Sequence, residues 1–144
     1  MTHFATFLVA VLVFAASQYL LKLVIEPVQQ HRRVVGSIAS YLLRNQAKIT
    51  NARPDSDLSS EAHRMAAELW SSASVVFGYE FVRLLRVFSL QSRSALLKAS
   101  RELNGIAAQL NPDNPQKGDA VECTRAVGRI GKLLDVPTSY EGPV

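Results

Sequence analysis

The sequence has few of the residues from which reactive sites are commonly built. Its single cysteine, Cys123, excludes an intramolecular disulfide and a multi-cysteine metal site, and we interpret it as a small packing residue. The sequence contains no glycine-rich phosphate-binding loop and no paired-carboxylate motif that would indicate acid–base chemistry. We therefore expect no cofactor, no metal and no enzymatic activity.

Histidines are also scarce. The three in the chain, His3, His31 and His63, are far apart, and none has a second ligand at zinc-binding spacing on its own segment. We predict that each of them lies at a surface or an interface.

Acidic residues are nearly absent from the first 50 positions. Five Lys and Arg residues stand there against one acidic residue, Glu26, whereas eleven basic and eleven acidic residues cancel over residues 51–144. The whole net charge of +4 therefore lies in the first 50 residues. Basic residues beside a membrane are attracted to anionic lipids, by about 1 kcal/mol each. Nucleic-acid binders instead carry a basic face across the domain. We expect contact with a lipid bilayer and none with nucleic acid.

The chain contains one long apolar run, from Phe4 to Ile25, in which Lys22 is the single charge. A helix of roughly 20 such residues crosses a bilayer, and the long stem of a lysine can reach the headgroups. We predict a transmembrane helix and its junction over residues 1–27. One alternative is a cleaved signal peptide, suggested by Ala15-Ala16-Ser17, but the basic segment that opens such peptides is missing. The other is a buried helix, which would need a polar stripe that the run lacks.

The positions of the basic residues predict an orientation. No Lys or Arg precedes the apolar run, and the basic residues follow it. Because basic flanks stay on the cytoplasmic side, we expect the N-terminus outside and the C-terminal domain in the cytoplasm.

The remainder of the chain shows the periodicity of helices rather than of strands. One apolar stripe at near-heptad spacing continues to residue 50: Val28, Val35, Ile38, Leu42 and Ile49. Pro27 cannot donate a backbone hydrogen bond to Leu23 and should kink the helix. Each helix must bury its stripe against another. We predict an all-α protein, in which an N-terminal transmembrane helix runs through the kink into an antiparallel cytoplasmic helical bundle over residues 28–136, followed by a flexible tail over 137–144.

Turn residues predict the boundaries of the later helices. Asp57 is the expected N-cap after a loop over residues 51–57, and Ser92 is the expected N-cap of a later helix. A helix is expected between them over residues 75–88, and Pro115 is expected to start the last helix. That helix should bury one side: Ala120, Thr124, Val127, Ile130 and Leu134.

The densest group of polar residues follows the apolar run. It consists of Lys22, Glu26, Pro27, Gln29, Arg32 and Arg33. Glu26 and Gln29 could bond to another chain while the two arginines engage phosphates, which would make this segment a site for a partner or for lipid headgroups. The alternative is an anchor that fixes only depth and topology.

A second candidate surface is aromatic. Phe77, Phe81 and Phe88 share a face of the helix expected over residues 75–88, in a segment that also carries Arg83 and Arg86. Three interpretations stay open: the central helix of the core, a helix lying in the membrane interface, or a surface for self-association.

The segment Ile25-Glu26-Pro27-Val28-Gln29-Gln30-His31-Arg32-Arg33-Val34-Val35-Gly36 resembles the post-membrane segment of small, uncharacterised bacterial single-pass membrane proteins. These have one span, a Glu-Pro-aliphatic-Gln element, a nearby Arg and a Gly before a helical domain. The resemblance is close over residues 15–43 and implies a bacterial inner-membrane protein. It implies no catalytic residue.

Two functional hypotheses follow. The first is a membrane-anchored, non-enzymatic interaction protein whose cytoplasmic bundle binds a partner protein or self-associates. The second is an oligomerising membrane effector that forms a pore or disrupts the bilayer. For the second, Ala10, Ala15, Ala16 and Ser17 offer a small-residue surface for helix contact, although the run has no GxxxG motif.

Overall fold

The structure, a computed structural model, describes residues 2–84, 89–114 and 118–140, and all regular elements in these ranges are helices. The predicted all-α class is therefore confirmed. The elements are α1 Thr2–Leu20, the π-helical turn η1 Leu21–Ile25, α2 Glu26–Arg44, α3 Gln46–Thr50, α4 Ser56–Val75, α5 Tyr79–Leu84, α6 Arg93–Leu110 and α7 Ala120–Leu134.

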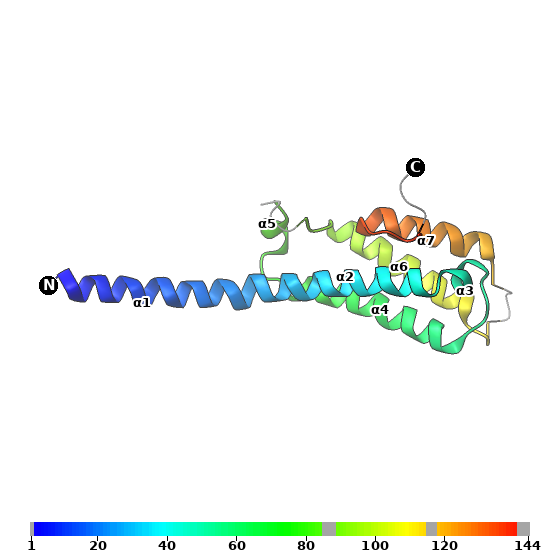
Figure 1. The fold of residues 1–144 in the computed structure, drawn as a ribbon, viewed down its shortest axis with the longest axis horizontal. Coiled ribbons are helices and arrows are strands. Elements are labelled where there is room, and N and C mark those ends of the chain that lie inside the picture. The colour runs from blue at the N-terminus through cyan, green and yellow to red at the C-terminus, as the bar shows by residue number, and fades with distance from the viewer. Residues whose placement is uncertain (1, 85–88, 115–117, 141–144) are drawn as a thin grey trace.

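α1, η1 and α2 form one continuous helix. Figure 1 shows its N-terminal half projecting alone from the rest of the protein, which we call the helical body. The helix from Phe4 to Arg44 has 41 residues, and its most apolar stretch has a mean hydropathy of 2.2 with none of its residues buried. At a rise of about 1.5 Å per residue, the run from Phe4 to Ile25 is about 33 Å long, against about 30 Å for a bilayer's hydrocarbon core. By length and composition, this helix is able to cross a membrane.

The junction between α1 and α2 is not sharply bent. Figure 1 shows the ribbon continuing nearly straight through it, so the kink predicted at Pro27 is not confirmed. The backbone instead widens into the π turn, where the N–H of Glu26 donates to the carbonyl of Leu21, five residues back. A π turn directly before Pro27 makes room for the proline ring, which lacks an N–H and would collide with a regular preceding turn.

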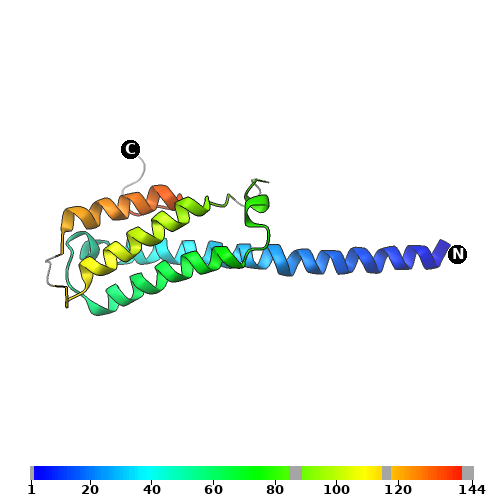
Figure 2. The ribbon, with the colours of Figure 1, turned by 180° about the vertical axis from the view of Figure 1, so that it is seen from behind.

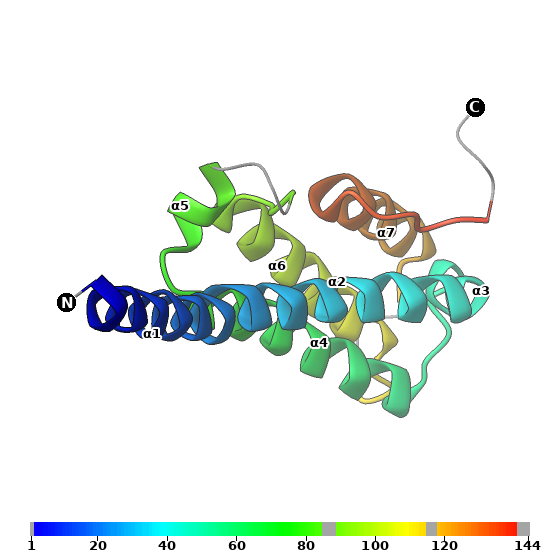
Figure 3. The ribbon, with the colours of Figure 1, turned by 60° about the vertical axis from the view of Figure 1, so that its left-hand side comes forward.

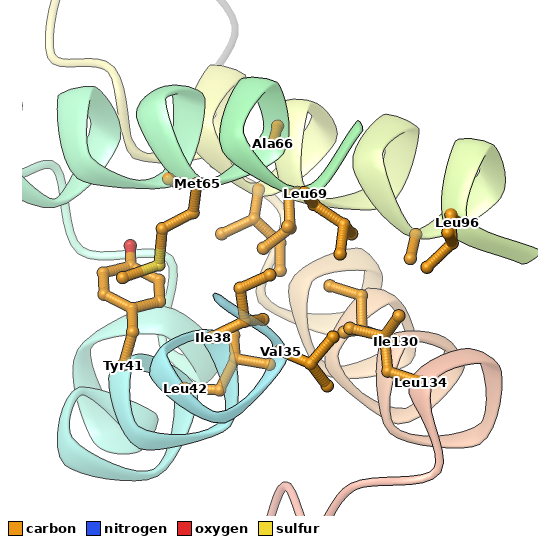
Figure 4. Close-up of a cluster of buried hydrophobic side chains, with 14 of the residues drawn as sticks. Val35, Ile38, Tyr41, Leu42, Met65, Ala66, Leu69, Leu96, Ile130 and Leu134 are labelled. Atoms are coloured by element: carbon orange, nitrogen blue, oxygen red, sulfur yellow. The ribbon is translucent and has the colours of Figure 1, made fainter. Parts of the chain in front are cut away.

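The core of the helical body lies between α2, α4, α6 and α7. α4 packs on α6 and α2, and α6 packs on α7. Figure 2 shows these helices lying lengthwise beside one another. In Figure 4, the labelled side chains of the four helices point toward one another, with Ile38 of α2 and Leu69 of α4 among them. The predicted stripe of α2 and α3 is confirmed, because all its members are buried: Val28, Val35, Ile38, Leu42 and Ile49.

Helix α4 begins two residues earlier than predicted. Asp55, rather than Asp57, is the N-cap, and its carboxylate accepts the backbone N–H groups of Asp57 and Leu58. Lys48 donates to the same carboxylate at 3.0 Å. The hydrogen bond from Lys48 holds the Asp55 carboxylate in place, which explains why Asp55 rather than Asp57 caps the helix. Ser92 is confirmed as the cap of α6, because its hydroxyl accepts the N–H of Ala95.

The helix expected over residues 75–88 is divided. α4 continues to Val75, and Gly78, with a φ of +62°, makes the turn before α5. That left-handed φ favours glycine and ends the regular helix. Phe88 lies outside the described residues, as does Pro115; α7 begins after Asp119, whose carboxylate caps it.

The buried side of α7 is rotated relative to the prediction. Ala120 and Thr124 are exposed, and the side chains that α7 buries are Cys123, Ala126, Val127, Ile130 and Leu134. The small residues Cys123 and Ala126 therefore lie on the packed face, which agrees with the interpretation of Cys123 as a small packing residue. After α7, Val136 donates its N–H to the carbonyl of Gly131. A Cβ on Gly131 would come within 2.9 Å of Thr138, so the start of the predicted flexible tail lies against α7.

Candidate functional site at the proximal end of the helical body

One end of the helical body, the end from which α1 projects, gathers most of the residues singled out in the sequence. We call it the proximal end. Figure 3 shows the start of α2, the C-terminal end of α4, α5 and the start of α6 meeting there. Three features define it: a buried histidine, an exposed aromatic surface, and the polar residues of the junction.

The buried histidine is His31 of α2, which the sequence analysis placed at a surface or an interface. The structure corrects this prediction, because the side chain of His31 is fully buried within the chain. Its Nδ1 lies 2.8 Å from the hydroxyl of Ser72 on α4. Its ring meets the ring of Tyr79 on α5 edge-on, with 6.0 Å between the centroids. His31 thus joins three helices.

The spacing of the chain explains this burial. His31 lies three residues after Val28 and four before Val35, which is the spacing of one helical face. The apolar stripe of α2 therefore passes through His31. The sequence therefore contained a signal for the burial of His31, which the lack of zinc-ligand partners does not affect.

The second ring nitrogen of His31 is unusual. Among the described residues, Nε2 is buried and has no hydrogen-bond partner. Burial lowers the pKa of His31 below its ordinary value, because the charged imidazolium would lose its hydration. The geometry therefore holds a neutral imidazole.

Tyr79 fastens α5 to the body. Its hydroxyl donates to the carbonyl of Gln91 at 2.8 Å, and the Gln91 amide donates to the carbonyl of Leu134 at the end of α7, at 2.7 Å. The guanidinium of Arg93 lies 5.4 Å from the centre of the Tyr79 ring, a cation–π distance. Burial raises the pKa of Tyr79 to about 12, with the Glu80 carboxylate acting in the same direction.

The aromatic surface lies on the opposite side of α5. It consists of Phe77, in the turn before α5, together with Phe81 and Leu84, and these side chains are 72%, 66% and 77% exposed. Tyr79 and Val82 are the residues that α5 buries. The interpretation of this segment as the central helix of the core is therefore wrong for Phe77 and Phe81. The membrane-interface and self-association interpretations stay open.

The junction residues surround the helix where α2 begins. The side chains of Lys22, Glu26, Gln29, Arg32 and Arg33 are exposed. Within the described part of the chain, none of the charged residues among them forms an ion pair. Unpaired charges remain available to an external partner or a lipid headgroup.

Pro27 and Arg32 differ from the other junction residues, because they line pockets against the body. Pro27 borders a pocket of about 330 Å³ between α2 and α4, whose other lining residues are Gln30, Val34, Glu68, Ser71, Ser72 and Val75. Arg32 borders a second pocket beside the C-terminal end of α7. Both pockets are open and mixed in polarity.

The remaining polar clusters maintain the fold. Arg129 of α7 donates to both carboxylate oxygens of Glu102 on α6, at 2.9 and 2.7 Å, and also binds Glu122. This group joins two helices on a half-exposed surface. Across residues 2–84, 89–114 and 118–140, no three His, Cys, Asp or Glu side chains come together as a metal site would require.

Comparison of the chain with protein-family models, curated proteins and solved structures finds no match. The resemblance of residues 15–43 to bacterial single-pass membrane proteins stays a prediction.

Proposed function

We propose that the protein is a membrane-anchored, non-enzymatic interaction protein. α1 spans a bilayer, and the helical body, an antiparallel cytoplasmic bundle, is held at the membrane surface to bind a partner protein or a second copy. The observation that carries this proposal is the division of one continuous helix. Its first half is apolar and has no buried residue in its most apolar stretch, whereas its second half supplies a stripe of the core. A long apolar surface that the rest of the chain leaves uncovered, on a helix of bilayer length, favours contact with lipid.

The topology is part of the same proposal. The unpaired basic residues Arg32 and Arg33 lie just beyond the apolar run, which favours a cytoplasmic position for the body and an external N-terminus. The resemblance of the junction segment favours a bacterial inner membrane.

A contact surface for a protein partner is suggested by Trp70. This side chain of α4 is 42% exposed. Tryptophan is over-represented among the residues that dominate binding energy at protein interfaces. Trp70 also lies on the same helix as Ser72 and Val75, which line the pocket beside Pro27.

Membrane anchoring is tested by extracting membranes that contain the full chain with alkaline carbonate, which removes peripheral proteins and leaves spanning ones. We expect the chain to remain in the membrane. The double substitution Leu12→Arg and Val13→Arg should release it, since each charge at the centre of a span costs about 2.5–3.5 kcal/mol. Leu97→Arg, on an exposed position of α6, is the matched control. Release of the unchanged protein would contradict anchoring.

Interaction is tested by photo-crosslinking in cells. A photoreactive residue at Trp70 should form a defined adduct with a partner or a second copy, and one at exposed Lys98 of α6 should not. The absence of an adduct at Trp70, together with a monomeric mass in detergent, would contradict the interaction.

A further inference from the structure

We propose that the aromatic surface of Phe77, Phe81 and Leu84 inserts into the headgroup region of the same bilayer leaflet that α1 leaves, as a second membrane contact. This inference rests on the proposed anchoring by α1, and it names the lipid interface as the partner of the aromatic surface. It does not depend on which protein the body binds.

The exposed face of α5 has the composition of a membrane-interface segment. Phe81 and Leu84 are three residues apart on α5 and so share its outer face, and Phe77 precedes them in the turn. All three are at least 66% exposed, whereas Tyr79 and Val82 hold the inner face in the core. An amphipathic element with aromatic and aliphatic side chains on its free face is typical of segments that lie in a membrane interface.

α5 lies close to the end of the apolar run. The edge-on contact between Tyr79 and His31 fixes α5 beside the start of α2. His31 is six residues beyond Ile25, which is about 9 Å along a helix axis. The headgroup region extends about 5–8 Å beyond the hydrocarbon core on each side. Figure 1 shows α5 standing beside the long helix at this junction, rather than at the far end of the body. The contact with His31 therefore lies at the outer edge of the headgroup region when α1 spans the bilayer, and the exposed side chains of α5 need to reach only a short distance to enter it.

Basic side chains outnumber acidic ones around the aromatic surface. Arg83 on α5 is paired with Glu80 at 2.8 Å, and Arg93 lies near the same carboxylate. The junction adds Lys22, Arg32 and Arg33 against Glu26, and none of these four has an ion-pair partner in the described ranges. An excess of basic groups near the end of the apolar run suits an anionic leaflet.

A second copy of the chain is the competing occupant. Two copies could pack this surface against itself about a two-fold axis, but its three side chains are a small part of the roughly 20–30 residues that each side of a stable interface contains. The bilayer needs no matching surface of that size.

The test uses the full chain reconstituted into vesicles of phosphatidylcholine and phosphatidylglycerol, with Trp70→Phe to remove the native tryptophan. Phe81→Trp then reports on the aromatic surface. Val121→Trp is the control, because Val121 is also apolar and 57% exposed but lies at the start of α7, at the far end of the body. Phe14→Trp reports on the span. Quenching by lipids brominated on the upper acyl chain is measured for each.

We expect quenching of Phe81→Trp to be several times that of Val121→Trp, with a blue-shifted emission. Equal quenching of these two, while Phe14→Trp is strongly quenched, would overturn the inference and leave the anchoring intact. A blue shift at Phe81→Trp without quenching, in a protein that crosslinks to itself, would assign the surface to a second copy and also overturn it. An unquenched Phe14→Trp would show that the anchoring itself has failed.

Phe77→Trp provides a second reporter if Phe81→Trp does not give the native circular dichroism spectrum. It should show the same contrast with Val121→Trp. Vesicles of phosphatidylcholine alone should reduce the quenching at both aromatic positions, because the basic groups then lose their anionic partners.

Discussion

His31 and Ser72, 41 residues apart in the sequence, join α2 to α4 through a hydrogen bond of 2.8 Å between Nδ1 and the serine hydroxyl. The bond is close to the point at which the apolar helix enters the body, and Tyr79 of α5 packs against the same imidazole. The His31 side chain of α2 therefore contacts both α4 and α5, the helix that carries the aromatic surface.

The buried imidazole should make the fold sensitive to mild acid. The pKa of His31 is lowered in the folded state, so the unfolded chain binds the proton more tightly. The stabilisation by neutral His31 is fully present above the unfolded pKa of about 6.5 and is lost progressively as pH falls below it. We expect the melting temperature to fall between pH 7.5 and 5.5, and His31→Asn to flatten this dependence, as measured by circular dichroism.

His63→Asn is the control for that experiment. His63 is exposed and bonds to Asn104 at the surface of the body. This substitution should leave the pH dependence of the melting temperature unchanged. A pH dependence that persists in His31→Asn and disappears in His63→Asn would contradict the assignment.

The attachment of α5 should depend on the Tyr79 hydroxyl. Tyr79→Phe removes the donor to the Gln91 carbonyl while retaining the ring contact with His31. A hydrogen bond of this kind contributes about 0.5–1.5 kcal/mol. We expect Tyr79→Phe to lower the free energy of unfolding by this amount. It should also accelerate amide hydrogen exchange more in α5 than in α6. Tyr140 is 80% exposed, so Tyr140→Phe should change neither the free energy of unfolding nor the hydrogen exchange of α5.

The position of the cap of α4 can be tested directly. Asp55→Ala should lower the melting temperature by several degrees, because it removes the acceptor for two backbone N–H groups and the partner of Lys48. Asp57→Ala should have a much smaller effect. The pKa of Asp55 is lowered by Lys48 and by these N–H groups, so its stabilisation is present above about pH 4 and is lost as pH falls through the folded value. A larger fall in melting temperature for Asp57→Ala than for Asp55→Ala would contradict this assignment and favour Asp57, the N-cap expected from the sequence.

The sequence predicted several features that depend on one helix alone, although not the whole buried side of α7. The heptad stripe of α2 and the cap at Ser92 were correct because helical period and capping are local properties. The cap at Asp55 could not be distinguished from Asp57, because the deciding interaction comes from Lys48 in the preceding helix.

The candidate site was only partly predictable for the same reason. The aromatic and junction residues were recognised from composition, but their exposure depends on where α5 is fastened. That fastening passes through Tyr79, Gln91 and the end of α7, over a sequence separation of 43 residues between the last two. The burial of His31 was indicated by its place on the apolar stripe of α2, but its partners Ser72 and Tyr79 are brought beside it only by the tertiary structure.

Two glycines of the body should respond in opposite ways to alanine. A Cβ on Gly118 would come within 2.8 Å of the Ala52 Cβ and of the Gln109 carbonyl, so the loops at the far end of the body would have to move. Such overpacking typically costs about 1–3 kcal/mol. A Cβ on Gly128, inside α7, would meet nothing within 4 Å, and alanine is favoured over glycine there by about 1 kcal/mol. Denaturant unfolding should therefore show Gly118→Ala destabilised and Gly128→Ala stabilised. Stabilisation by Gly118→Ala, as expected for Gly128→Ala, would mean that the far-end loops do not pack as closely as described.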